Sequence, residues 1–128
     1  MGLGRKEREM FYSAVKQKLI KTPFATCYRI PTHEKRDAFE PTDRQDFEID
    51  VLEDEPDGSA IIWEIKDDAD AKAIGQLLLY ENLIRKLERY KDKKTFKAIL
   101  CHTIKREIKE TAENLNIMVF FLKEKKAK

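Results

Sequence analysis

Two short segments joined by a tight turn constrain the fold of this chain most strongly. Residues 46–53 (DFEIDVLE) alternate between apolar and polar side chains, which predicts a half-buried β-strand. Residues 54–59 (DEPDGS) have the composition of a turn, and residues 60–66 (AIIWEIK) have that of a returning strand. The sequence therefore predicts an antiparallel β-hairpin against which the other elements must pack.

Helical and apolar segments precede and follow this hairpin. Helices are expected at residues 5–21, 69–92 and 104–114. Further strands are expected at residues 24–30, 95–101 and 117–122, the last two being nearly continuous apolar runs. Residues 32–44 show no period and are expected to form a loop. The order α-β-β-β-α-β-α-β predicts an α/β domain with a mixed β-sheet flanked by helices, in which parallel crossovers follow the hairpin.

Length and composition exclude several classes of protein. A chain of 128 residues forms one domain, so we expect a single domain over residues 1–128, with a short basic tail at 123–128. No apolar run approaches the ~20 residues of a membrane span, and the charged N-terminal sequence is not that of a signal peptide. Cys27 and Cys101 have neither metal-site nor disulfide spacing. These features indicate a reduced, intracellular, cytoplasmic protein without a membrane partner.

The formal net charge of +2 conceals a separation of charge along the chain. Residues 37–57 contain ten acids and one base, whereas residues 84–97 contain seven bases and two acids. The last ten residues carry four lysines and one glutamate. An acidic centre with basic flanks suits a metal site beside a phosphate-binding surface, although two solvated faces would give the same pattern.

Three polar residues of the hairpin suggest a chemical role. Glu64 and Lys66 are two apart on a strand and therefore share a face, and the turn brings Asp50 close to Glu64. Two adjacent carboxylates repel one another, and a hard divalent cation such as Mg²⁺ relieves that repulsion. A lysine beside the cation can lower the pKa of a metal-bound water or neutralise charge on phosphorus. An ordinary solvated strand face, with a local Glu64–Lys66 ion pair, is the alternative.

The arrangement of Asp50 with Glu64-x-Lys66 fourteen residues on resembles the PD-(D/E)XK, or restriction-endonuclease-like, nuclease superfamily, without the proline that gives the motif its name. Glu7, in the sequence GRKERE, is similar to the first-helix glutamate of archaeal Holliday-junction resolvases. The pair Gln76-x-x-x-Tyr80 resembles the helical motif of RecB-type members. Residues 98–122 resemble the last strand, helix and strand of the archaeal NucS/EndoMS C-terminal nuclease domain. The resemblance covers almost the whole chain and implies the restriction-endonuclease-like fold.

The resemblance also implies roles for the hairpin residues. Asp50, Glu64 and the Ile65 carbonyl would be ligands of Mg²⁺, for which Mn²⁺ would substitute. Lys66 would position or activate the attacking water. The implied reaction is an in-line hydrolysis of a phosphodiester bond that leaves a 5′-phosphate.

The helical residues have supporting roles in the same scheme. Glu7 would reach the metal through a water, with Glu9 as the alternative helical acid. Gln76 and Tyr80 would orient the catalytic lysine or hold the scissile phosphate, unless they are simply polar tips at the rim of the helix interface.

The sequence thus predicts a Mg²⁺-dependent deoxyribonuclease, either an endonuclease or an exonuclease. Because the chain is too small to contain a separate DNA-recognition domain, specificity would come from a homodimer or a partner subunit. One alternative is a catalytically inactive nucleic-acid-binding or assembly module on the same fold. Another is a structural protein without a nucleic-acid partner.

Overall fold

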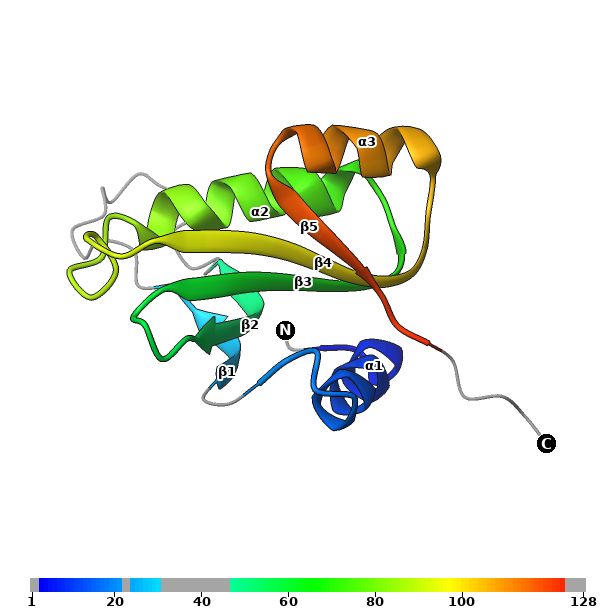
Figure 1. Ribbon diagram of the computed structural model, residues 1–128, viewed down its shortest axis with the longest axis horizontal. Helices are drawn as coiled ribbons and strands as arrows, with labels where there is room; N and C mark the ends of the chain where they lie inside the picture. The colour runs from blue at the N-terminus through cyan, green and yellow to red at the C-terminus, as the bar shows by residue number, and fades with distance from the viewer. Residues whose placement is uncertain (1–2, 22–23, 31–46, 124–128) are drawn as a thin grey trace, which may run out of the picture.

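Five β-strands form one mixed sheet that carries helices on both faces in the computed structural model (Figure 1). The structure describes residues 3–21, 24–30 and 47–123. In chain order the elements are α1 (Arg5–Lys16), β1 (Phe24–Arg29), β2 (Glu48–Asp54), β3 (Ala60–Ala69), α2 (Ala71–Ile84), β4 (Thr95–Ile104), α3 (Arg106–Asn114) and β5 (Ile117–Phe121). The predicted fold class and element order are confirmed. The predicted loop at 32–44 and residues 124–128 of the tail lie outside the described residues.

The strands lie side by side in their sequence order, β1-β2-β3-β4-β5. The β1–β2 and β2–β3 pairs are antiparallel, whereas the β3–β4 and β4–β5 pairs are parallel. The β2–β3 turn contains Gly58 at φ +93°, a backbone conformation that glycine adopts without steric strain. This arrangement confirms the predicted hairpin and the two parallel crossovers.

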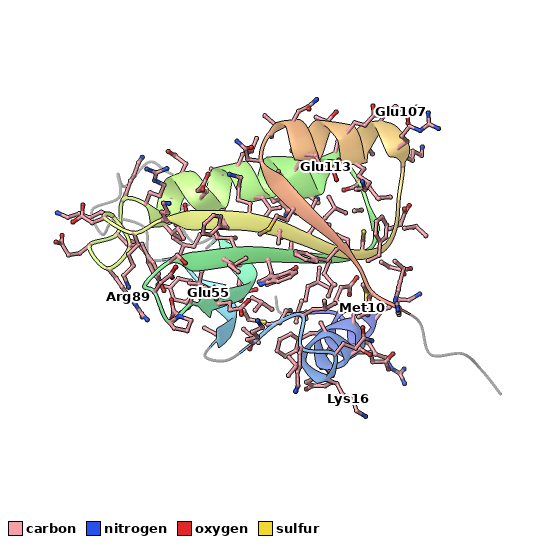
Figure 2. The ribbon with its side chains drawn as sticks, viewed as in Figure 1. Met10, Lys16, Glu55, Arg89, Glu107 and Glu113 are labelled. Atoms are coloured by element: carbon pink, nitrogen blue, oxygen red, sulfur yellow. The ribbon has the colours of Figure 1, made fainter. Side chains whose placement is uncertain are left out.

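The sheet separates two apolar layers. α2 and α3 cover one face and contribute to a cluster that includes Ile62 and Ile99, whereas α1 packs on the other face with Trp63 and Leu100 (Figure 1). Met10 of α1 lies between that helix and the sheet (Figure 2). The middle of β4 is therefore buried on both faces, as its nearly continuous apolar sequence predicts, and β3 is buried there with it. The similar expectation for β5 is wrong, because β5 lies at the edge of the sheet and leaves Met118 and Phe121 37% and 48% exposed. Among the described residues, no helix is both long and apolar enough to cross a membrane.

The first helix is shorter than predicted, because α1 ends at Lys16 and not at residue 21. The Ala14 carbonyl accepts hydrogen bonds from the backbone N–H groups of Leu19 and Ile20, at 2.9 and 3.4 Å. Lys18 adopts a left-handed φ of +63° within this turn. The turn redirects the chain so that Ile20 is buried in the core, which a continued helix would not allow.

The elements beyond the hairpin also begin and end at different residues from those predicted. β3 continues past residue 66 to Ala69, and β4 past residue 101 to Ile104, because the two strands stay paired over that length. Asp70 then caps α2 by accepting a hydrogen bond from the Ala73 N–H at 3.2 Å, so this helix begins at residue 71 and not at 69.

The second helix is also shorter at its C-terminal end. α2 stops at Ile84 and not near residue 92, and successive turns follow it. Within those turns the Tyr90 side chain is buried, and its hydroxyl donates to Asp54 Oδ1 at 3.3 Å. The burial of Tyr90 explains why the polar sequence after residue 84 does not continue as a solvent-exposed helix. The remaining differences are of one or two residues, with β1, β2, α3 and β5 bounded as given above.

A buried carboxylate fixes the hairpin to the segment that follows α1. Glu53 is 2% exposed, and its Oε1 accepts from Trp63 Nε1 at 2.9 Å while its Oε2 accepts from the Lys21 N–H at 2.9 Å. We expect Glu53→Ala to lower the free energy of unfolding by about 2–4 kcal/mol, because it leaves the buried Trp63 indole N–H and the part-buried Lys21 N–H without an acceptor. Chemical denaturation followed by circular dichroism measures the change. Glu53→Gln, which keeps one acceptor, should lose less, and the exposed control Glu110→Ala should stay within about 0.5 kcal/mol of wild type.

Candidate functional site

A cavity of about 420 Å³ lies between α1, the β2–β3 hairpin and α2. All seven residues that the sequence predicts for the site contribute to its lining, which is formed by Leu3, Gly4, Glu7, Glu48, Asp50, Glu64, Ile65, Lys66, Gln76 and Tyr80. These residues come from four segments that are far apart in the sequence. The fold therefore brings the predicted residues to one place.

The end of the β2–β3 ladder positions the two hairpin carboxylates. The last paired residues are Val51 and Trp63, so Asp50 and Glu64 are the next positions on each strand. There Asp50 Oδ2 accepts a hydrogen bond from the Ile65 backbone N–H at 2.8 Å. A side-chain oxygen thus takes the place of a backbone acceptor, and this bond holds the Asp50 carboxylate beside Glu64.

Burial and mutual repulsion make these two carboxylates weak acids. Burial, the largest cause, raises the pKa of Asp50 to about 6, against the opposing effects of the Ile65 N–H and the Lys66 charge. Burial followed by the charge of Asp50 raises the pKa of Glu64 to about 8, again against Lys66. The pocket therefore disfavours two negative charges unless a cation accompanies them.

The second helix supplies a polar pair to the cavity. Gln76 and Tyr80 are four residues apart on α2 and so lie on one face of the helix. Burial, followed by the charges of Glu64 and Asp50, raises the pKa of Tyr80 to about 12, so its hydroxyl remains a donor at neutral pH. Gln76 Oε1 is buried and has no hydrogen-bond partner within the described part of the chain. An unsatisfied buried acceptor costs about 1–3 kcal/mol, which favours a donor from a bound ligand or water at this position.

The first turn of α1 brings Glu7 to the cavity. Gly4 is the N-cap of this helix, and a Cβ atom at Gly4 would lie 2.6 Å from Glu7 Oε1. The glycine therefore leaves the space that the Glu7 carboxylate occupies. Glu9, the alternative helical acid, has a side chain 71% exposed and lines a different cavity. Of the two helical acids, Glu7 is the one that faces Asp50 and Glu64.

Sequence reasoning missed Glu48 as a residue of the cavity. Glu48 lies two residues before Asp50 on β2, and its charge raises the pKa of Asp50 further. The two-residue period of a strand was the signal that could have identified it, because Glu48, Asp50 and Leu52 share a face. Leu3 and Gly4 precede α1 and left no comparable signal.

His102 does not line this cavity. Its Nδ1 lies 2.8 Å from Asp67 Oδ1, and Lys6 Nζ lies 3.1 Å from the other oxygen of the same carboxylate. These contacts join β4, β3 and α1 at the residues adjacent to Lys66 and Glu7. The histidine therefore joins three elements beside the cavity without lining it.

The oxygen atoms at the cavity suit a hard divalent cation. Among the described residues no three His, Cys, Asp or Glu side chains are grouped closely enough to hold a metal ion by themselves. The predicted ligand set does not require such a group, because it consists of two carboxylates and the Ile65 carbonyl. Mg²⁺ keeps several waters and is commonly held by one or two carboxylates together with substrate phosphate. The raised pKa values of Asp50 and Glu64 are a second indication of fit, since a cation would relieve the repulsion that contributes to them.

Solved structures of repair endonucleases share this fold. A repair endonuclease from Pyrococcus abyssi superposes with a TM-score of 0.60 at 15% identity, over 96% of this chain and 48% of that chain. EndoMS in its apo form gives a TM-score of 0.61 at 20% identity, over 98% and 49% of the two chains. The EndoMS-dsDNA2 complex gives 0.58 at 17% identity, over 98% and 47%. The chain therefore has the restriction-endonuclease-like α/β fold and spans about half the length of these proteins.

Comparison of sequences adds nothing to this likeness. No family model matches the chain, and no curated protein sequence matches it. At identities of 15–20% the structural likeness establishes the fold alone.

The carboxylate pair makes stability depend on pH. In metal-free buffer we expect the wild type to lose stability as the pH rises through about 6 and then about 8, because the folded state holds protons that unfolded carboxyls have already released. The contribution is fully present below about pH 4, the range of unfolded carboxyl groups. Glu64→Gln removes the larger part of this effect, so its melting temperature should exceed that of wild type by several degrees near pH 9 and approach it near pH 5, at roughly 4 °C per kcal/mol. Thermal melts across this range, with exposed Glu110→Gln as control, measure the difference, and parallel curves for wild type and Glu64→Gln would contradict the assignment.

Proposed function

We propose that the protein is a Mg²⁺-dependent nuclease that hydrolyses phosphodiester bonds of DNA at the cavity between α1, the hairpin and α2. The observation that carries the proposal is the convergence of Glu7, Asp50, Glu64 and Lys66 on one cavity. The likeness of the fold to repair endonucleases, one of them solved as a complex with DNA, supports the choice of reaction and substrate.

In this proposal Asp50, Glu64 and the Ile65 carbonyl hold Mg²⁺. When bound, the ion supplies Lewis-acid stabilisation of charge on the phosphoryl group and lowers the pKa of a coordinated water. The Asp50–Ile65 hydrogen bond fixes one ligand in advance, so little rearrangement is needed when the ion enters. Glu7 lines the same cavity from α1 and would accept a hydrogen bond from a water held there.

The remaining residues of the cavity orient the substrate and the attacking water. Lys66 donates to that water or to a non-bridging phosphate oxygen and offsets the charge that develops during in-line displacement. Tyr80 and Gln76 donate hydrogen bonds from α2, and the unsatisfied Gln76 Oε1 accepts one from the water beside Lys66. A 5′-phosphate product is expected.

We also propose that a second copy of the chain or a partner subunit provides selectivity among DNA structures. The chain spans only about half the length of the endonucleases with which it shares its fold.

The first experiment is a cleavage assay on single-stranded, duplex and branched DNA with Mg²⁺ or Mn²⁺. Replacing Lys66 with Ala, Glu64 with Gln or Asp50 with Asn should slow cleavage by on the order of 100-fold or more, because each removes a metal ligand or the cation beside the attacking water. Exposed Glu110→Gln should cleave as wild type does. If wild-type protein cuts none of these substrates with either metal, the proposed activity is wrong for this chain.

Metal binding is tested separately from turnover. Because a ligand of the native state stabilises it by about 2.7 kcal/mol at one hundred times its dissociation constant, Mn²⁺ or Mg²⁺ should raise the melting temperature of wild type by several degrees. Asp50→Asn should show little or no rise, whereas Glu110→Gln should keep all of it. A wild-type rise that persists in Asp50→Asn would place the ion elsewhere, and binding of DNA without cleavage would favour the inactive DNA-binding module.

A further inference from the structure

We propose that the connection between α2 and β4 is a second contact surface for duplex DNA, which holds the phosphate backbone beside the catalytic cavity. This inference rests on the proposed function and extends it to how the substrate is held. The cations of this connection are termed the basic surface and are Arg85, Lys86, Arg89, Lys91, Lys93 and Lys94.

The basic surface is hollowed and its cations outnumber its acids. A cavity of about 320 Å³ is lined by four of the six cations together with Asp92 and Thr95. Residues 85–94 contain only two acids, Glu88 and Asp92. A concave surface with excess positive charge is suited to a phosphate group or a run of them.

Only two of the six cations of the basic surface form ion pairs within the described part of the chain. Arg89 lies 3.1 Å from Asp54 Oδ2, and Lys91 lies 3.3 Å from Glu88 Oε2. The other four cations form no ion pair with a carboxylate of residues 3–21, 24–30 or 47–123. Favourable interaction with the C-terminal dipole of α2 accounts for Arg85 and Lys86, but Lys93 and Lys94 lie well beyond the last turn of that helix.

The segment that carries these cations is anchored in the core. Tyr90 is 1% exposed, and its hydroxyl is bonded to Asp54 of the hairpin. Arg89 and Lys93 lie over its ring, 5.2 and 5.5 Å from the ring centre. At the end of the segment, Thr95 Oγ1 donates to Glu81 Oε2 at 2.6 Å. The cations are therefore held on an ordered support, so binding a polyanion requires little additional ordering of the backbone.

The basic surface lies within a few phosphates of the catalytic cavity. Arg85 is five residues after Tyr80, which corresponds to about 7.5 Å along the helix axis. The Lys94 carbonyl accepts from the Ala60 N–H at 3.0 Å, and Ala60 is four residues, or about 13 Å, from Glu64 on β3. Because phosphates of one strand follow each other every ~3.4 Å along the axis of duplex DNA, this separation corresponds to about four phosphates.

The charge of the catalytic cavity explains why such a surface is needed. Four carboxylates and one lysine line that cavity, so it repels a polyanion unless cations are supplied. A basic surface nearby offsets this repulsion and keeps the DNA in place while the scissile phosphate enters. In this proposal the substrate contact extends from the cavity along α2 toward the α2–β4 connection, into which α2 leads (Figure 1).

The test compares two double variants that remove equal charge at opposite ends of β4. Lys93→Gln/Lys94→Gln alters the basic surface just before β4, and Lys105→Gln/Arg106→Gln alters the start of α3 just after β4. Ile99 and Cys101, the β4 partners of Glu64 and Lys66, lie between the two altered pairs. Fluorescence anisotropy with a duplex of about 20 base pairs, in EDTA and at several salt concentrations, measures binding without cleavage. We expect the first variant to bind at least about fivefold more weakly, and its log–log salt slope to fall by about 2, since each phosphate contact contributes about 0.9. The α3 variant should bind within about twofold of wild type, and melting curves should match for all three proteins.

Other results would overturn the inference. Unchanged affinity and slope in Lys93→Gln/Lys94→Gln, equal losses in both variants, or tighter binding of an RNA duplex of the same sequence would each do so. A protein that loses DNA binding with Lys93 and Lys94 but cleaves nothing would contradict the proposed nuclease and leave this inference intact. Cleavage of DNA by the wild type, together with equal DNA affinity of the two double variants, would support the proposed nuclease and overturn this inference.

Discussion

The hydrogen bond from the Ile65 N–H to the Asp50 carboxylate determines the geometry of the candidate site. It forms where β2 and β3 stop pairing through their backbones, and it converts a strand end into a carboxylate pair. Without it, Asp50 and Glu64 would separate, because burial and their mutual charge act against their proximity. The proximity of the two carboxylates, and with it part of their weak acidity, follows from this contact.

Helices on opposite faces of the sheet hold different residues of the candidate site in place. α1 closes one side of the hairpin with an apolar face and presents Glu7 from its first turn, in the space that Gly4 leaves. α2 packs on the opposite face and presents Gln76 and Tyr80, and the Lys97–Glu81 contact of 2.8 Å joins it to β4. The site therefore depends on three elements that are each fixed by their own core contacts.

Much of this arrangement was predictable from sequence, because the elements that matter have strong periodic patterns. The alternation of β2, the apolar runs of β4 and β5 and the turn at Gly58 each depend on residues near one another in the chain. Helix ends were less predictable, since α1 stops where Ile20 must enter the core and α2 stops where Tyr90 does. Both are tertiary effects that no local pattern contains.

The predicted site residues illustrate the same distinction. The spacing of Glu64 and Lys66 follows from the strand period alone, and Gln76 and Tyr80 from the helix period. The placement of Glu7 beside them, and of Glu48 among them, depends on how α1 and β2 meet in space. The resemblance to a nuclease superfamily pointed to Glu7. It did not point to Glu48, because Glu48 belongs to no part of the motif.

The single tryptophan of the chain lies one residue before Glu64, on the opposite face of the same strand. Trp63 is 1% exposed, bonded to Glu53 through its indole nitrogen, and packed 5.2 Å from the ring of Phe120. Its emission therefore comes from one defined environment directly behind the carboxylate pair. A movement of this strand should therefore change the fluorescence emission of Trp63, without an attached dye or an engineered label.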